Sequence, residues 1–91
     1  MAVRNGGEVK YVTIEVTQED INKGEREGGF HCPIARAAHR AGFPDAYVAE
    51  REWCPIDLGP AVPLSKRARD FVAAFDAGRP VHPDRFRLRV E

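Results

Sequence analysis

A cysteine beside a histidine, at the start of a predicted helix, is the feature of this sequence closest to reactive chemistry. Cys32 lies at the expected helix start, and Pro33 takes the first helical position. The positive end of a helix dipole lowers the pKa of a thiol and favours the nucleophilic thiolate. Catalysis also needs a base within reach, and the side chain of adjacent His31 is expected to diverge from the thiol. The simpler interpretation is a half-buried capping thiol, with a reactive thiol at Cys32 as the alternative.

The same residue types could bind zinc. No cysteine or histidine pair has the Cys-x-x-Cys or His-x-x-x-His spacing of structural zinc sites. His39 lies about 10 Å from Cys32 along one helix, too far to share an ion. A site could then form only if the fold happened to bring together His31, Cys32, Cys54 and His82. The sequence therefore predicts no metal and no cofactor.

An arginine-bearing strand near the C-terminus is the third feature. Alternation puts Arg85, Arg87 and Arg89 on one face, opposite an apolar face. If this strand pairs with the first strand, Tyr11 joins the arginines on the outer face. Such a face could simply be solvated, or it could bind an acidic protein partner. It could also bind single-stranded nucleic acid through stacking and phosphate contacts.

A cluster of cations begins the third predicted helix. Lys66, Arg67 and Arg69 lie in its first turn, where positive charge opposes the helix dipole. Surfaces tolerate such an arrangement, and the functional alternative is an anion or an acidic partner docked there.

Composition narrows the functional classes. The 91 residues suit one small domain, and 14 basic side chains balance 14 acidic ones. Zero net charge argues against a protein built for duplex DNA. No glycine-rich phosphate loop, catalytic carboxylate pair or Ser-His-Asp set is recognisable, which predicts a non-enzymatic protein. The absence of an apolar run and of a signal-peptide core, with only two cysteines, predicts a cytoplasmic protein without membrane association.

Periodicity and capping residues predict the elements that position these side chains. Alternating or apolar runs predict strands over 9–16, 46–49, 53–58 and 86–90. Capping signals and helical spacing predict helices over 17–24, 33–41 and from Leu64 or Ser65 to Ala77. Since Pro55 cannot donate to a ladder, the third strand should lie at an edge or contain a bulge. Residues 59–63 are expected to form a loop.

These elements predict one α+β domain of the order β-α-α-β-β-α-β over residues 9–91, preceded by a flexible tail over residues 1–8. About four strands are expected in a single sheet, with the helices packed on one face. The buried side of the first and last strands should lie beneath Phe71 and Phe75.

Three motifs together resemble a group of small uncharacterised proteins from actinobacterial phages and actinobacteria. The similarity covers Tyr11 to Val90 and depends on Val16-Thr17-Gln18-Glu19-Asp20-Ile21 with Gly24, on Cys32-Pro33-Ile34-Ala35 with Ala37, and on Phe71, Phe75, Asp76, Gly78 and Pro83. The resemblance implies a phage-type accessory protein in the bacterial host cytoplasm and assigns no activity or site.

The leading hypothesis is a non-enzymatic protein that binds a protein partner, either a host protein or a second copy of itself. The alternative is a nucleic-acid-binding protein that uses the face of Arg85, Arg87 and Arg89. A thiol- or zinc-dependent protein that uses Cys32 is the third hypothesis.

Overall fold

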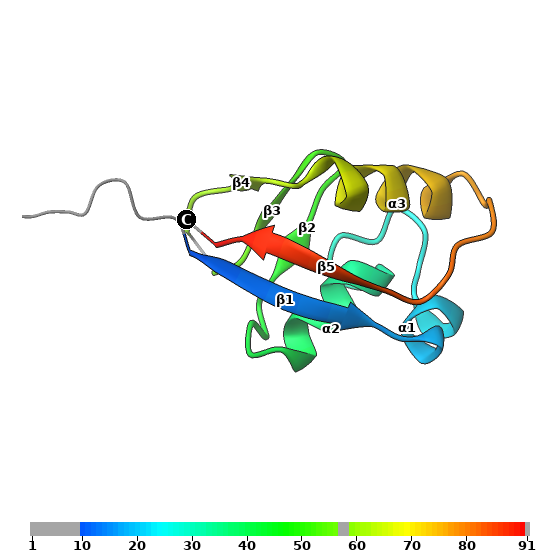
Figure 1. Ribbon diagram of the computed structural model, residues 1–91, viewed down its shortest axis with the longest axis horizontal. Coiled ribbons are helices and arrows are strands. Elements are labelled where there is room, and N and C mark those ends of the chain that lie inside the picture. Colours follow the sequence, from blue (N-terminus) through cyan, green and yellow to red (C-terminus); the bar gives the residue numbers. More distant parts are fainter. Residues whose placement is uncertain (1–9, 57–58, 91) are drawn as a thin grey trace, which may run out of the picture.

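The computed structural model describes residues 10–56 and 59–90, which form one small α+β domain, as the sequence predicts. The predicted tail, residues 1–8, lies outside the described residues. In these ranges the chain forms three helices and five short strands (Figure 1). The elements in chain order are β1 Tyr11–Val16, α1 Gln18–Lys23, α2 Pro33–Arg40, β2 Tyr47–Val48, β3 Glu52–Cys54, β4 Val62–Pro63, α3 Lys66–Asp76 and β5 Asp84–Arg89.

The strands form two antiparallel sheets instead of the single sheet expected. The first sheet pairs β1 with β5, and the second has the order β2-β3-β4. The segment 59–63, expected to be a loop, contributes β4. The central strand β3 ends at Cys54, immediately before Pro55, so this proline interrupts no ladder. The prediction that this strand lies at an edge or contains a bulge is therefore wrong.

The first two helices begin at the predicted capping residues, and the third begins at Lys66, one or two residues after the expected start at Leu64 or Ser65. Thr17 forms a complete capping box with Asp20 at the start of α1. Cys32 caps α2 through its sulfur, and Ser65 caps α3 through its hydroxyl oxygen. Gly42, two residues after α2, has φ +112°, a backbone conformation that glycine adopts without strain.

The core lies between the β1–β5 sheet, the helices and the three-stranded sheet. Alternate residues of β1 and β5 are buried, among them Ile14, Phe86 and Leu88. The ring of Phe71 on α3 packs edge-to-face on Phe86, with centroids 5.2 Å apart. In Figure 1, β1 and β5 lie in front, and α2 and the three-stranded sheet lie behind them. The sheet is thus covered on one face, as predicted.

Trp53 connects the two sheets. It is 1% exposed, and its indole nitrogen donates a 2.9 Å hydrogen bond to the backbone carbonyl of Arg89 in β5. Phe43 packs edge-to-face against the indole. No helix in the described part of the chain has the length and apolar character needed to cross a bilayer.

Candidate functional site

The uncovered face of the β1–β5 sheet contains most of the residues predicted for binding. The register pairs Tyr11 with Arg89, Thr13 with Arg87, and Glu15 with Arg85. All six side chains are exposed, and they define the outer face of the sheet. The structure therefore brings Tyr11 together with the three arginines, because every second residue of a strand shares one face.

Arg87 and Tyr11 contact each other directly on the outer face. The Arg87 guanidinium lies over the Tyr11 ring, 4.2 Å from its centroid, in a cation–π arrangement. Among the described residues, no carboxylate forms an ion pair with Arg87, and its side chain is exposed. Arg85 has a weak surface partner, since its Nε lies 3.5 Å from Glu15 Oε2 and both side chains are largely exposed.

The predicted cation cluster of α3 divides into different contacts. Lys66 Nζ donates to Asp70 Oδ2 at 2.9 Å, and this hydrogen bond lowers the pKa of Asp70. Arg67 reaches β5, where it pairs with the carboxylate of Asp84 and donates to the Arg85 carbonyl at 3.3 Å. The backbone N–H of Arg85, followed by Arg67, lowers the pKa of Asp84. The cluster thus serves partly to attach α3 to β5.

Arg69, the third member of the cluster, points elsewhere. Its Nε is buried without a hydrogen-bond partner in the described chain. The side chain lines a shallow hollow together with Glu50 and Asp70. Because these acids share the hollow with the cations, the three basic residues do not converge on one anion site.

Cys32 is buried, with 5% of its surface exposed. Its sulfur accepts a 3.4 Å hydrogen bond from the Ala35 N–H. Burial raises the pKa of the Cys32 thiol and outweighs the lowering by the backbone N–H groups at the helix start. The position therefore favours the neutral, capping thiol of the simpler interpretation over a reactive thiolate.

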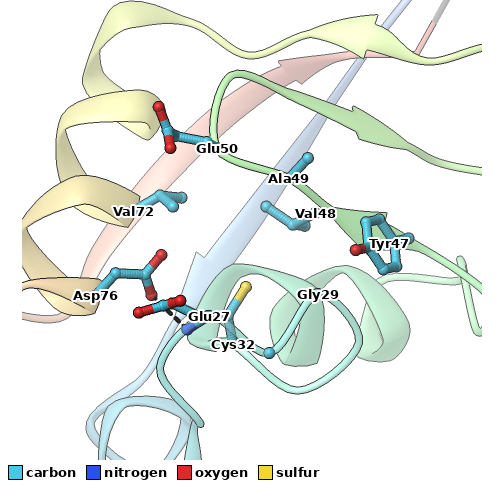
Figure 2. A pocket seen from close by; sticks show the side chains of 10 residues that line it. Glu27, Gly29, Cys32, Tyr47, Val48, Ala49, Glu50, Val72 and Asp76 are labelled. Carbon is cyan, nitrogen blue, oxygen red and sulfur yellow. Dashed lines mark hydrogen bonds between the residues drawn. The ribbon is translucent and has the colours of Figure 1, made fainter.

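A cleft of about 250 Å³ lies above this thiol (Figure 2). It separates β2 and the following turn from α3, and the Cys32 sulfur points into it. Its acidic residues are Glu27, Glu50 and Asp76. One of them is already used, because Asp76 Oδ1 accepts a 2.8 Å hydrogen bond from the Glu27 N–H.

Among the described residues, no histidine lines this cleft beside Cys32. His31 is exposed, and His39 Nε2 lies 2.9 Å from the Ala46 carbonyl oxygen. Across residues 10–56 and 59–90, no group of three or more His, Cys, Asp or Glu side chains is placed to hold a metal ion. The zinc set considered from sequence is therefore not assembled there.

Sequence reasoning missed one cluster, centred on a buried charge. Asp20 is 0% exposed, and Arg40 of α2 donates to both of its oxygens, at 3.0 and 2.7 Å. Arg36 Nε lies 3.4 Å away, within ion-pair distance but without hydrogen-bond geometry. The sequence feature that could have indicated this cluster is the spacing of Arg36 and Arg40, one turn apart on α2. This cluster joins α1 to α2 and leaves no carboxylate oxygen for a ligand.

Comparison with protein-family models, with curated proteins and with solved structures finds no match to this chain. The choice among functions therefore depends on the geometry of the outer face.

Proposed function

We propose that this protein is a non-enzymatic binding protein that holds a protein partner on the outer face of the β1–β5 sheet. The observation that carries the proposal is the Arg87–Tyr11 pair, an exposed guanidinium that lies over an aromatic ring, 4.2 Å from its centroid. Ordering a long side chain before binding reduces the entropy lost on association, and Arg and Tyr are the types enriched at interface hot spots.

The charges of the outer face favour an acidic partner. It contains three arginines and one acid, Glu15, within a chain of zero formal net charge. Arg87 has no carboxylate partner among the described residues and can form a bidentate contact with one from another protein. Complementary charge of this kind accelerates association and selects partners.

Single-stranded nucleic acid is the second candidate, because arginines alternate along a solvent-facing strand. Single strands bind chiefly by stacking bases on aromatic rings. On the outer face the aromatic side chain is Tyr11, and Arg87 already covers its ring. A base could stack there only after displacing that guanidinium, which favours the protein partner.

Affinity capture followed by reconstitution tests this proposal. Proteins retained from a bacterial lysate are identified, purified and titrated against the wild type, Arg87→Glu and Arg79→Glu. Arg79 is an exposed arginine outside the outer face, so its variant controls for net charge. We expect Arg87→Glu to weaken binding by about tenfold or more and Arg79→Glu to leave it unchanged.

A partner affinity insensitive to Arg87→Glu would place the interface elsewhere and refute the proposal. Steeply salt-dependent binding of a thymidine oligonucleotide, lost in Arg87→Glu, would instead favour the nucleic-acid candidate. In keeping with the resemblance noted above, we propose a phage-type protein acting in the bacterial cytoplasm, where a host lysate is the appropriate source of partners.

A further inference from the structure

The backbone hydrogen bonds of the β1–β5 sheet define which residues bond to the partner strand and which face a sheet edge. Val90 N–H donates to the Lys10 carbonyl at 2.8 Å, next to the paired residues Tyr11 and Arg89. In an antiparallel ladder, hydrogen-bonded and non-hydrogen-bonded pairs alternate. Val12–Leu88 and Ile14–Phe86 are therefore bonded pairs. The intervening residues direct their N–H and C=O groups away from the partner strand, toward the two edges of the sheet.

Side chains from other elements cap three of the edge carbonyls. On β5, Arg67 donates to the Arg85 carbonyl at 3.3 Å, and Trp53 donates to the Arg89 carbonyl at 2.9 Å. On β1, Arg40 donates to the Glu15 carbonyl at 2.8 Å. Capping an edge carbonyl in this way blocks the pairing of another strand at that position.

On β5 the outward-facing Arg87 lies between the two capped residues, Arg85 and Arg89, whereas in the described chain the first half of β1 has no such cap on either of its two outward-facing residues. The backbone groups of Tyr11 and Thr13 point to the edge opposite β5, and within residues 10–56 and 59–90 no hydrogen bond satisfies them there. Both side chains are exposed. This edge adjoins the outer face, because the residues with open backbone groups also contribute its side chains.

We infer that the partner adds a short strand to the β1 edge at Tyr11 and Thr13, and that this strand is an acidic, extended peptide segment. The inference rests on the proposed function and names the partner's chemistry. An added strand would form up to about four backbone hydrogen bonds with these two residues, because each offers one donor and one acceptor.

Side-chain geometry explains why the segment should be acidic. The partner residue opposite Thr13 lies on the outer face, and Arg87 lies directly across Thr13 on the other side. Neighbouring strands are about 4.8 Å apart, so one small threonine separates the partner side chain from a long arginine. A carboxylate at that position can accept a hydrogen bond from Arg87. The residues on either side of it in the partner segment point to the other face of the sheet, where the half-buried Val12 lies. The expected pattern is acid–apolar–acid.

Amide hydrogen exchange tests the strand addition. The probe is an end-capped seven-residue peptide of alternating glutamate and valine, and an alternating lysine–valine peptide is its control. In the unbound protein, the amides of Tyr11 and Thr13 should exchange quickly and those of Val12 and Ile14 slowly. The acidic peptide should slow Tyr11 and Thr13 by at least tenfold, and the lysine peptide should not.

Substitutions at Thr13 provide a second measurement. Thr13→Pro removes an N–H that faces the open edge and no ladder hydrogen bond, a position at which strands tolerate proline. It should weaken binding of the glutamate–valine peptide at least tenfold, whereas Thr13→Val should bind like the wild type. Should Thr13→Pro fail to fold, the exchange measurement on the wild type still decides.

The outcomes separate this inference from the proposed function. Binding that requires Arg87 but leaves the Tyr11 and Thr13 amides unprotected would overturn strand addition and preserve the outer-face interface. Failure of the acidic peptide to bind even at millimolar concentration would overturn the inference. The outer-face interface is tested independently by titrating the captured partner against Arg87→Glu. If the Tyr11 and Thr13 amides became protected without peptide as the protein concentration rose, the added strand would come from a second copy of the chain, and the acidic segment would be ruled out. Protection by a thymidine oligonucleotide alone would exclude a peptide occupant.

Discussion

The guanidinium of Arg40 holds both carboxylate oxygens of the fully buried Asp20, at 3.0 and 2.7 Å. The same guanidinium donates to the Glu15 carbonyl at 2.8 Å, so one side chain connects α2 with α1 and β1. A buried charge without its partner is costly, which makes this pair the most sensitive electrostatic contact in the described structure.

Removal of the Arg40 guanidinium should therefore destabilise the fold. We expect Arg40→Met to lower the free energy of unfolding by about 2 to 3 kcal/mol, because Asp20 keeps only the 3.4 Å contact with Arg36 and its capping-box bonds. Urea denaturation measures the change. The matched control is Lys23→Met, which removes an exposed ion pair with Glu19 and should cost less than about 0.5 kcal/mol. Equal losses in the two variants would contradict this account.

The same carboxylate predicts an acid-dependent loss of stability. Burial raises the pKa of Asp20, but the hydrogen bond from Arg40 and those from Thr17 outweigh burial and hold the pKa at about 2, below the usual aspartate value of 3.8. Since the folded-state pKa is depressed, the stabilisation is complete above about pH 4 and is lost as pH falls from about 4 to about 2. Its size is about 2 kcal/mol.

Comparison of wild type with Asp20→Asn over this pH range isolates the contribution. The variant should be less stable at pH 6, and the difference should shrink as pH falls toward 2. Asp70 and Asp84, whose pKa values are also lowered, are present in both proteins and cancel in the difference. A difference that stayed constant down to pH 2 would show that Asp20 is not held ionised.

Thiol labelling should distinguish the two free cysteines. Burial raises the pKa of Cys32, whereas Cys54 is partly exposed. We expect native Cys32→Ser, which retains Cys54, to react with iodoacetamide at least about tenfold faster than Cys54→Ser, which retains Cys32. In denaturing urea the two rates should converge. Faster labelling of Cys32 in the native protein would revive the reactive-thiol hypothesis.

The hydrogen bond between Trp53 and the Arg89 carbonyl should contribute to the joining of the two sheets. Trp53→Phe removes the indole donor and leaves the carbonyl without this partner, at an expected cost of about 1 to 3 kcal/mol in the free energy of unfolding. Thermal denaturation followed by circular dichroism provides the measurement. Tyr47→Phe, which alters a half-exposed ring, should change stability by less than about 0.5 kcal/mol.

Local signals predicted much of this fold. The capping box at Thr17, the Cys32-Pro33 helix start and the alternation of Phe86 and Leu88 each depend on residues within one turn or one strand. Such local signals can be recognised in the sequence without knowledge of tertiary contacts. They also predicted the composition of the outer face, because alternation alone decides which side chains share a side.

The division into two sheets had no comparable signal. Strands β2 and β4 contain two residues each, too few for a period to show. Their pairing depends on contacts across a turn and on Trp53. The Asp20–Arg40 pair and the cleft above Cys32 unite residues from separate elements, and only the folded chain brings them together.

The pairing of β1 with β5 joins positions 68 to 78 residues apart, from Val16 with Asp84 to Tyr11 with Arg89. During synthesis, the first strand leaves the ribosome long before residues 84–89 are made. The β1 edge that pairs with β5 therefore stays unpaired through almost the entire translation of the domain, exposed to chaperones and to other nascent chains. Such distant closure also slows folding relative to a helical bundle of equal length, so the yield of native protein depends on how this interval is managed in the cell.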